Sequence, residues 1–233
     1  MTDKVAIITA AGRGMGAATA RRLAADGYRL VLMSLSDNAA RVAEELGGVG
    51  ISGSTANAAD LEALVKAALD AYGRIDAVVT HTGGPPKGDL LAIDDDAWHH
   101  GLDLVILLVQ RMARLVTPVM QAQGGGVFLN ITTFSAFEPD LRFPVSSVLR
   151  AGVGAYAKLY ADRYGKDGIR MNNLLPGFTD SLDLPAGIAE PAALKRIGRV
   201  DEIAATAAFL LSDGAGYITG QNIRVDGGYT RSV

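Results

Sequence analysis

The stretch that decides the fold lies near the start of the chain and reads Val5-Ala-Ile-Ile-Thr9-Ala-Ala-Gly12-Arg13-Gly14-Met15-Gly16. Its apolar first half is typical of a buried strand, and the Ala-rich segment after Gly16 is typical of a helix. Three glycines therefore stand where a strand turns into a helix N-terminus. Free N–H groups and the helix dipole favour a phosphate there, and the absent side chains let it approach the backbone. The loop predicts a nucleotide site, although the same glycines also suit a tight turn that binds nothing.

Short β-branched runs alternate with Ala- and Leu-rich segments along the rest of the chain. We expect strands over residues 5–9, 29–34, 50–53, 77–80, 126–132, 170–175 and 222–225, and helices over 16–26, 39–46, 60–72, 95–123, 146–164 and 200–212. Continuously apolar strands are typical of parallel sheets, whose right-handed crossovers place helices on both faces. The sequence therefore predicts a single doubly wound α/β domain of the Rossmann type over residues 1–233, with a parallel seven-stranded sheet.

The composition is that of an ordinary globular protein. Of 233 residues, 49% are hydrophobic, which excludes a disordered chain, and the net charge of −3 without a basic cluster argues against a nucleic-acid partner. The absence of cysteine excludes disulfides and thiolate chemistry. The first residues show no secretory signal, and the apolar run at 104–109 is far shorter than the roughly 20 residues that span a bilayer. We therefore expect a cytoplasmic protein without membrane insertion.

Further motifs stand at the expected ends of strands. Gly73-Arg-Ile-Asp76 precedes the fourth strand, Asn130-Ile131 lies on the fifth and Pro176-Gly177 follows the sixth. The most specific stretch runs from Gly198-Arg199 to Val225-Asp226-Gly227-Gly228. With Thr9, Gly14 and Gly16, these motifs resemble the short-chain dehydrogenase/reductase family over nearly the whole chain, although Ala10 replaces the first glycine of the family's loop. The resemblance implies hydride transfer between a nicotinamide cofactor and a small carbonyl or alcohol, in a homotetramer.

The resemblance also assigns a cofactor site at the ends of the strands and at the starts of the following segments. Its residues would be Thr9, Gly12, Arg13, Gly14, Met15, Gly16, Ser34, Ser54, Thr55, Gly83, Arg150, Pro176, Gly177 and Phe178. The second strand ends in Met33-Ser34-Leu35-Ser36, with no acidic residue to bind a ribose 2′-hydroxyl. Arg13 could instead meet a 2′-phosphate. We therefore expect NADP in preference to NAD.

The family's catalytic residues are replaced in this chain. The register of Arg150-Ala-Gly152-Val153 places Ser146 at the family's tyrosine and Arg150 at its lysine. Thr133 stands at the family's serine and Val105 at its asparagine. A guanidinium keeps its charge and presents donors in a fixed fork. We expect Thr133 and Ser146 to orient the substrate oxygen, and Arg150 to stabilise its negative charge and bind the nicotinamide ribose.

The replaced tyrosine leaves the source of the proton open. Water or His81 could move it, since His81 titrates near neutral pH and follows a strand at the ligand-binding edge; alternatively, His81 only joins neighbouring strands. Phe143 has the tyrosine spacing of enoyl reductases but carries no proton. Tyr156 and Tyr160 are expected to pack against neighbouring side chains. The acidic residues at 94–96 indicate a helix N-cap rather than a metal site, and no metal is expected.

The sequence is compatible with three functions. The first is an NAD(P)-dependent oxidoreductase with an atypical centre. The second is a nucleotide-binding pseudoenzyme that senses the cofactor or completes an oligomer, and the third is a non-redox lyase or dehalogenase built on Arg150. The segment at 178–197 resembles the family's substrate loop. Its apolar residues suggest a small apolar substrate, although such residues can also serve only to dock the loop. The apolar stretch at 101–119 is typical of either a subunit interface or a long core helix.

Overall fold

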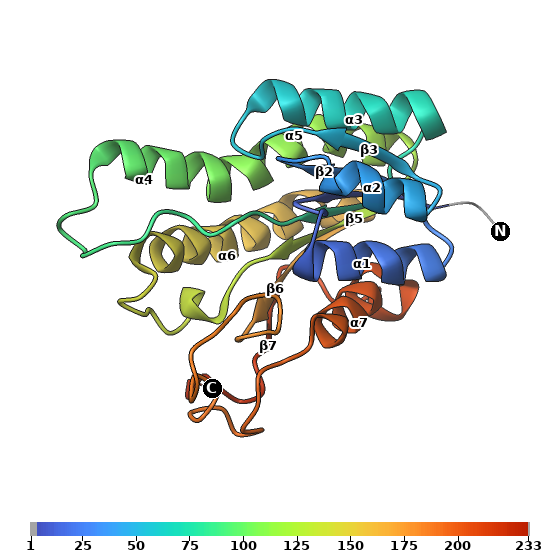
Figure 1. Ribbon diagram of the computed structural model, residues 1–233. Helices are drawn as coiled ribbons and strands as arrows, with labels where there is room; N and C mark the ends of the chain where they lie inside the picture. Colours follow the sequence, from blue (N-terminus) through green and yellow to red (C-terminus); the bar gives the residue numbers. More distant parts are fainter. Residues whose placement is uncertain (1–3, 233) are drawn as a thin grey trace.

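Short apolar strands form one parallel sheet in the computed structural model, which describes residues 4–232 (Figure 1). The strand order is β3-β2-β1-β4-β5-β6-β7. The strands are β1 (Val5–Thr9), β2 (Arg29–Ser34), β3 (Val49–Ser52), β4 (Ala77–Thr80), β5 (Gly126–Ile131), β6 (Ile169–Pro176) and β7 (Asn222–Val225). The order reverses direction between β1 and β4, which is where doubly wound sheets bind ligands. The predicted parallel seven-stranded sheet is confirmed.

Helices cover both faces of this sheet. They are α1 (Gly14–Ala25), α2 (Asn38–Glu45), α3 (Ala58–Tyr72), α4 (Asp95–Leu102), α5 (Leu108–Ala122), α6 (Pro144–Tyr164) and α7 (Val200–Leu211). One buried apolar cluster joins the sheet to α3, α5 and α6, and a second joins it to α1, α2 and α7. Figure 1 shows α3 and α5 on one side and α1 and α7 on the other. None of the helices in residues 4–232 has the length and apolar character needed to cross a membrane.

The predicted element boundaries hold within a few residues, with one informative difference. The helix expected over residues 95–123 is divided by a π-helical turn at Asp103–Leu107. Val105 lies in this turn and is buried against the core, and the turn places it beside the cavity that contains Arg150. Such turns are common at functional sites. Hydrophobic periodicity does not reveal this one, because the stretch at 101–119 is apolar around most of its circumference.

Several loops meet at the carboxyl edge of the sheet, next to β1, β4, β5 and β6. The side-chain hydroxyl of Thr9 donates a hydrogen bond of 2.6 Å to the carbonyl of His81 and accepts one of 2.8 Å from its N–H. Thr80 donates to Asn130, which in turn donates to Asn173, each over 2.7 Å. Buried polar groups that are fully bonded in this way rigidify their surroundings. This network joins β1, β4, β5 and β6 directly beneath the loops that could bind a ligand.

Ala10 adopts a left-handed backbone conformation with φ +49°. This conformation costs a residue with a Cβ roughly 1–2 kcal/mol. Glycine adopts it without a steric penalty, but glycine loses more conformational entropy when the chain folds. We expect Ala10→Gly to raise the free energy of unfolding by about 0.5–1 kcal/mol. Urea denaturation measures this change, with Ala205→Gly in α7 as a matched control that should lower stability by a similar amount. A loss of stability in Ala10→Gly would contradict the strain.

Candidate functional site

The glycine loop leaves the N-terminus of α1 open to a ligand. α1 begins at Gly14, and the preceding Arg13 provides no side-chain cap to the helix. The first turn contains no acidic side chain, so nothing within it satisfies the free N–H groups or opposes the positive end of the helix dipole. Gly14 has φ +55°, and a Cβ at Gly16 would lie 2.4 Å from the carbonyl oxygen of Ala10. The turn thus requires glycine and fits an anionic group such as a pyrophosphate.

A cavity of about 580 Å³ lies beside this loop. Its lining includes Gly12, Arg13, Ser34, Ser54, Thr55 and Gly83 of the predicted cofactor residues. It also contains His100 and Leu104, which the sequence analysis did not assign to the cofactor. Among the described residues, no aspartate or glutamate lines it. Its size, glycine-rich wall and lack of negative charge fit the adenosine end of a dinucleotide.

A second cavity, of about 170 Å³, opens between α6 and the segment after β6. It brings together all three predicted catalytic residues, Thr133, Ser146 and Arg150. Met15, Gly177 and Phe178 from the predicted cofactor set line it as well. Gly84 lines both this cavity and the larger one, so the two adjoin. A dinucleotide in the larger cavity could therefore reach toward the three catalytic candidates.

Arg150 is buried, with 7% of its surface exposed, and has no carboxylate partner among the described residues. Its Nε donates to the hydroxyl of Ser146 over 3.1 Å, and one terminal nitrogen donates to the carbonyl of Ile131 over 3.0 Å. Burial lowers the pKa of Arg150 to about 10, so the group is still a cation at neutral pH. These two bonds use only part of the five N–H donors of a guanidinium. A buried, uncompensated cation with spare N–H donors can bind an oxygen atom and stabilise negative charge that develops on it.

His81 lies beside this cation, at a small buried cavity lined also by Asn130, Val105 and Thr132. Its Nδ1 is buried and has no hydrogen-bond partner. Burial and, to a lesser extent, the charge of Arg150 lower the pKa of His81 to about 4, against the opposing effect of the carbonyl of Ala10. The imidazole is therefore neutral at physiological pH. Its Nδ1 can accept a hydrogen bond there, but the ring carries no positive charge with which to start as a proton donor.

This depressed pKa predicts an acid sensitivity. The unfolded chain binds the His81 proton below about pH 6.5, whereas the folded chain binds it only near pH 4, so stability falls as the pH falls through this window. Between pH 7 and pH 5 we expect the imidazole to cost the folded state about 2 kcal/mol. Urea unfolding at both pH values measures the loss, and His81→Gln should show a correspondingly smaller one. An equal loss in both proteins would show that His81 does not titrate in this way.

Other predicted residues have structural partners of their own. The hydroxyl of Ser34 donates to the carbonyl of Ser36 over 2.6 Å and accepts from the N–H of Ala39 over 3.0 Å. Thr55 shares a buried hydrogen bond of 3.1 Å with Thr82. These contacts shape the wall of the larger cavity. Pro176 ends β6, and Gly177 packs so closely on Asp226 that a Cβ would lie 2.8 Å from its Cα.

The remaining side chains considered in the sequence analysis lie in the core or at helix ends. Tyr160 is buried and shares a hydrogen bond of 2.6 Å with Thr117, and its ring contacts those of Tyr156 and Tyr164. Burial raises the pKa of Tyr160, as expected for a core phenol. Asp94 caps α4 by accepting from the N–H of Ala97 over 2.8 Å. These structural interpretations are confirmed.

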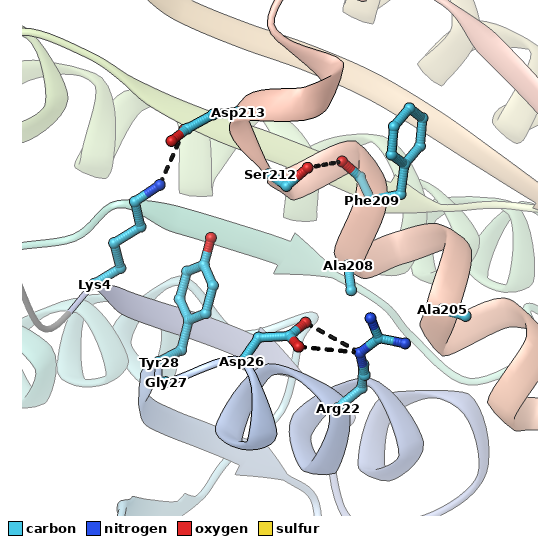
Figure 2. Close-up of a pocket in the computed structure, with 10 residues that line it drawn as sticks. All are labelled: Lys4, Arg22, Asp26, Gly27, Tyr28, Ala205, Ala208, Phe209, Ser212 and Asp213. Carbon is cyan, nitrogen blue, oxygen red and sulfur yellow. Dashed lines mark hydrogen bonds and ion pairs between the residues drawn. The ribbon is translucent and has the colours of Figure 1, made fainter. Parts of the chain in front are cut away.

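A further cavity, of about 770 Å³, lies at the amino edge of the sheet, between α1 and α7 (Figure 2). Its charged groups are already paired, because Lys4 contacts Asp213 and Arg22 contacts Asp26, each over 3.0 Å. Ligands of doubly wound folds bind at the opposite, carboxyl edge. The amino-edge cavity is therefore not the candidate functional site.

Known proteins resemble this chain over nearly its full length. A family model described as enoyl-(acyl carrier protein) reductase matches residues 9–230. Dehydrogenase/reductase SDR family member 4 of Oryctolagus cuniculus is 32% identical, covering 98% of this chain and 94% of that protein. A 3-oxoacyl-[acyl-carrier-protein] reductase of Synechocystis is 34% identical, covering 98% and 97%. The crystal structure of L-sorbose reductase from Gluconobacter frateurii with NADPH and L-sorbose has a TM-score of 0.94 at 26% identity, covering 100% of this chain and 98% of that one.

The doubly wound sheet, the open helix N-terminus and the adjoining cavities are typical of folds that bind dinucleotides. Together with the matches in sequence and structure, they show that the chain belongs to the short-chain dehydrogenase/reductase family. The family's enzymes are NAD(P)-dependent oxidoreductases. The family resemblance that we inferred from the sequence motifs is confirmed.

Proposed function

We propose that this protein reduces small carbonyl compounds with NADPH through a catalytic centre built on Arg150, Ser146 and Thr133. The observation that carries the proposal is the buried guanidinium of Arg150, which has no carboxylate partner among the described residues and is bonded to Ser146. A cation held in this way is costly unless an electron-rich group uses it. A carbonyl oxygen that becomes an alkoxide is such a group.

Met15, Gly177 and Phe178 at the smaller cavity would hold the nicotinamide end of a dinucleotide, which would supply a hydride to a carbonyl carbon. Arg150 donates to the carbonyl oxygen and stabilises the negative charge that develops on it. Thr133 and Ser146 line the same cavity and fix the position of that oxygen. Their fixed geometry lowers the entropic part of the barrier.

The proton that completes the alcohol comes from water, either directly or through the hydroxyl of Ser146, which water then reprotonates. The bond between Arg150 Nε and Ser146 Oγ lets the cation stabilise Ser146 as it loses a proton. His81 lies beside Arg150 at the small buried cavity, and its imidazole is uncharged at neutral pH because its pKa is about 4. We therefore assign His81 no role as the initial donor.

Cofactor preference rests on Arg13. Its side chain is exposed at the larger cavity, which no acidic residue within 4–232 lines, and the end of β2 also lacks an acidic side chain. A charge-assisted bond to a 2′-phosphate contributes about 1.5–3 kcal/mol. We expect Arg13→Ala to weaken NADPH binding by roughly 10- to 100-fold and NADH binding by less than about 3-fold.

Calorimetric titration of both cofactors measures this difference. Arg41→Ala in α2 is a suitable control, because Arg41 is exposed and does not line the cavity. Equal weakening of NADPH and NADH by Arg13→Ala would show that Arg13 does not select the cofactor.

The assembly and location of the protein are further proposals. We retain the homotetramer that the family resemblance implies, together with a cytoplasmic location. Large apolar side chains exposed on α6 and α7, Leu159 and Phe209, support the idea of subunit contacts. Neither a nucleic acid nor a membrane is proposed as a partner.

The proposed reaction is tested by following the absorbance of NADPH with a panel of small ketones and aldehydes. Oxidation of NADPH that depends on both enzyme and carbonyl compound is the expected result. Cofactor binding without any carbonyl-dependent oxidation would instead favour a nucleotide-binding protein without catalysis.

A further inference from the structure

The smaller cavity, of about 170 Å³, would hold the substrate in the proposed reaction and is called the substrate cavity below; it contains an uncompensated positive charge. Lys87 and Arg150 both line it, and within residues 4–232 no aspartate or glutamate does. The two cations differ in their surroundings: Arg150 is buried, whereas Lys87 is exposed on the segment between β4 and α4. The cavity is therefore positive both at its base and at its entrance.

Lys87 differs from its basic neighbour Arg142, which is already neutralised. Arg142 forms an ion pair with Asp140 and donates to the hydroxyl of Tyr229 over 3.0 Å. The ammonium of Lys87 instead lies 4.9 Å from the ring centre of Phe143, and no carboxylate among the described residues is within ion-pairing distance of it. Contact with the ring positions the lysine without neutralising its charge. Lys87 is therefore free to bind an anion.

The rest of the cavity is apolar. Phe134, Phe143, Phe178, Leu182 and Leu184 form its walls. Phe134 and Phe178 contact each other with ring centres 5.3 Å apart, and both contact the ring of Tyr229. The volume of about 170 Å³ corresponds to on the order of a dozen water-sized positions. These walls would accommodate a ligand whose apolar part is flat or branched and matches the cavity in volume.

We propose that the substrate is a small apolar keto compound that carries a carboxylate, with Lys87 binding the carboxylate and Arg150 binding the keto oxygen. This assignment rests on the proposed reductase function. A carboxylate fits better than a phosphate, because a single flexible ammonium balances one negative charge and the second cation is held in the base of the cavity by Ser146 and Ile131. The apolar body lies between the two charges, against the phenylalanine and leucine walls.

A matched pair of ligands tests the proposal. 4-Acetylbenzoate and 4-acetylbenzamide have the same shape and differ in charge, as do their 3-acetyl isomers. We expect the protein loaded with NADP+, which cannot reduce a ketone, to bind the carboxylates roughly three- to five-fold more tightly than the amides in calorimetric titrations. Lys87→Met should reduce this ratio to about one, and Lys87→Glu should reverse it. Lys166→Met, which changes an exposed lysine outside the cavity, should keep the wild-type ratio.

The two proposals fail in distinguishable ways. If no carboxylate binds more tightly than its amide, or if Lys87→Met keeps the preference, the carboxylate assignment is overturned. If the preference is present and depends on Lys87 but neither ligand oxidises NADPH, the anion site stands and the proposed reductase function fails for these ketones. Turnover of both ligands with equal KM supports the reductase and overturns the carboxylate site.

Discussion

Replacing Arg150 by alanine is expected to lower kcat for carbonyl reduction by about 100- to 1000-fold. The guanidinium is the only cation at the base of the substrate cavity within the described residues, and it is held by Ser146 and the carbonyl of Ile131. Its removal deprives the developing alkoxide of its donor and leaves the hydroxyl of Ser146 without a neighbouring charge. Steady-state kinetics with saturating NADPH measures the loss.

Two further variants separate this effect from a general loss of structure. Arg150→Lys keeps the charge but lacks the planar fork, so we expect it to lose at least about ten-fold in kcat while it still binds cofactor. Arg170→Lys changes a half-buried arginine on β6 that donates to the carbonyls of Leu210 and Ser212, outside the substrate cavity. It should affect stability more than kcat. Full activity in Arg150→Ala would remove this residue from the catalytic centre.

Replacing Gly16 by valine is expected to weaken cofactor binding by on the order of 100-fold or more and to destabilise the fold by about 1–3 kcal/mol. The added Cβ would lie 2.4 Å from the carbonyl oxygen of Ala10 and 3.0 Å from the Cα of Ala11. Backbone atoms cannot yield as a flexible side chain can, so the loop must move. Urea unfolding and calorimetric titration with NADPH measure the two effects.

Gly14→Ala isolates the effect on binding from the effect on stability. Gly14 has φ +55°, and an added Cβ would approach only the side chain of Ser181, at 3.1 Å. Gly27→Ala is the matched control, because Gly27 has φ +89°, has open space around it and lies at the amino edge of the sheet. Both variants should lose about 1 kcal/mol of stability, but only Gly14→Ala should lose NADPH affinity. Unchanged affinity in Gly14→Ala would exclude the glycine loop from the cofactor site.

Most of the fold follows from local sequence patterns. The alternation of apolar strands with Ala-rich helices predicts the parallel sheet, because central strands such as β1 and β4 are buried on both faces and each crossover needs a helix. The π-helical turn at Asp103–Leu107 could not be predicted in this way. It depends on how the helix meets α6 and the sheet, which a local hydrophobic pattern does not record.

Sequence motifs predict the catalytic part of the candidate site but not its second cation, Lys87. The predicted catalytic residues Thr133, Ser146 and Arg150 do line one cavity, which their separation in the sequence alone does not require. Lys87 escaped notice because an exposed lysine in a loop has no distinguishing sequence pattern. Its significance comes from Phe143, which lies 4.9 Å away in space but far along the chain, and from the absence of a carboxylate partner in residues 4–232.

The central claim is that the Arg150 centre supports hydride transfer, and isotope transfer tests it most directly. NADPH deuterated at C4 of the nicotinamide is incubated with the protein and a panel of neutral and carboxylated ketones, and the products are examined by mass spectrometry. We predict an alcohol that has gained deuterium at the former carbonyl carbon, at a rate reduced at least 100-fold in Arg150→Ala. Tight NADPH binding without deuterium in any product, or equal deuterium transfer by wild type and Arg150→Ala, would contradict the claim.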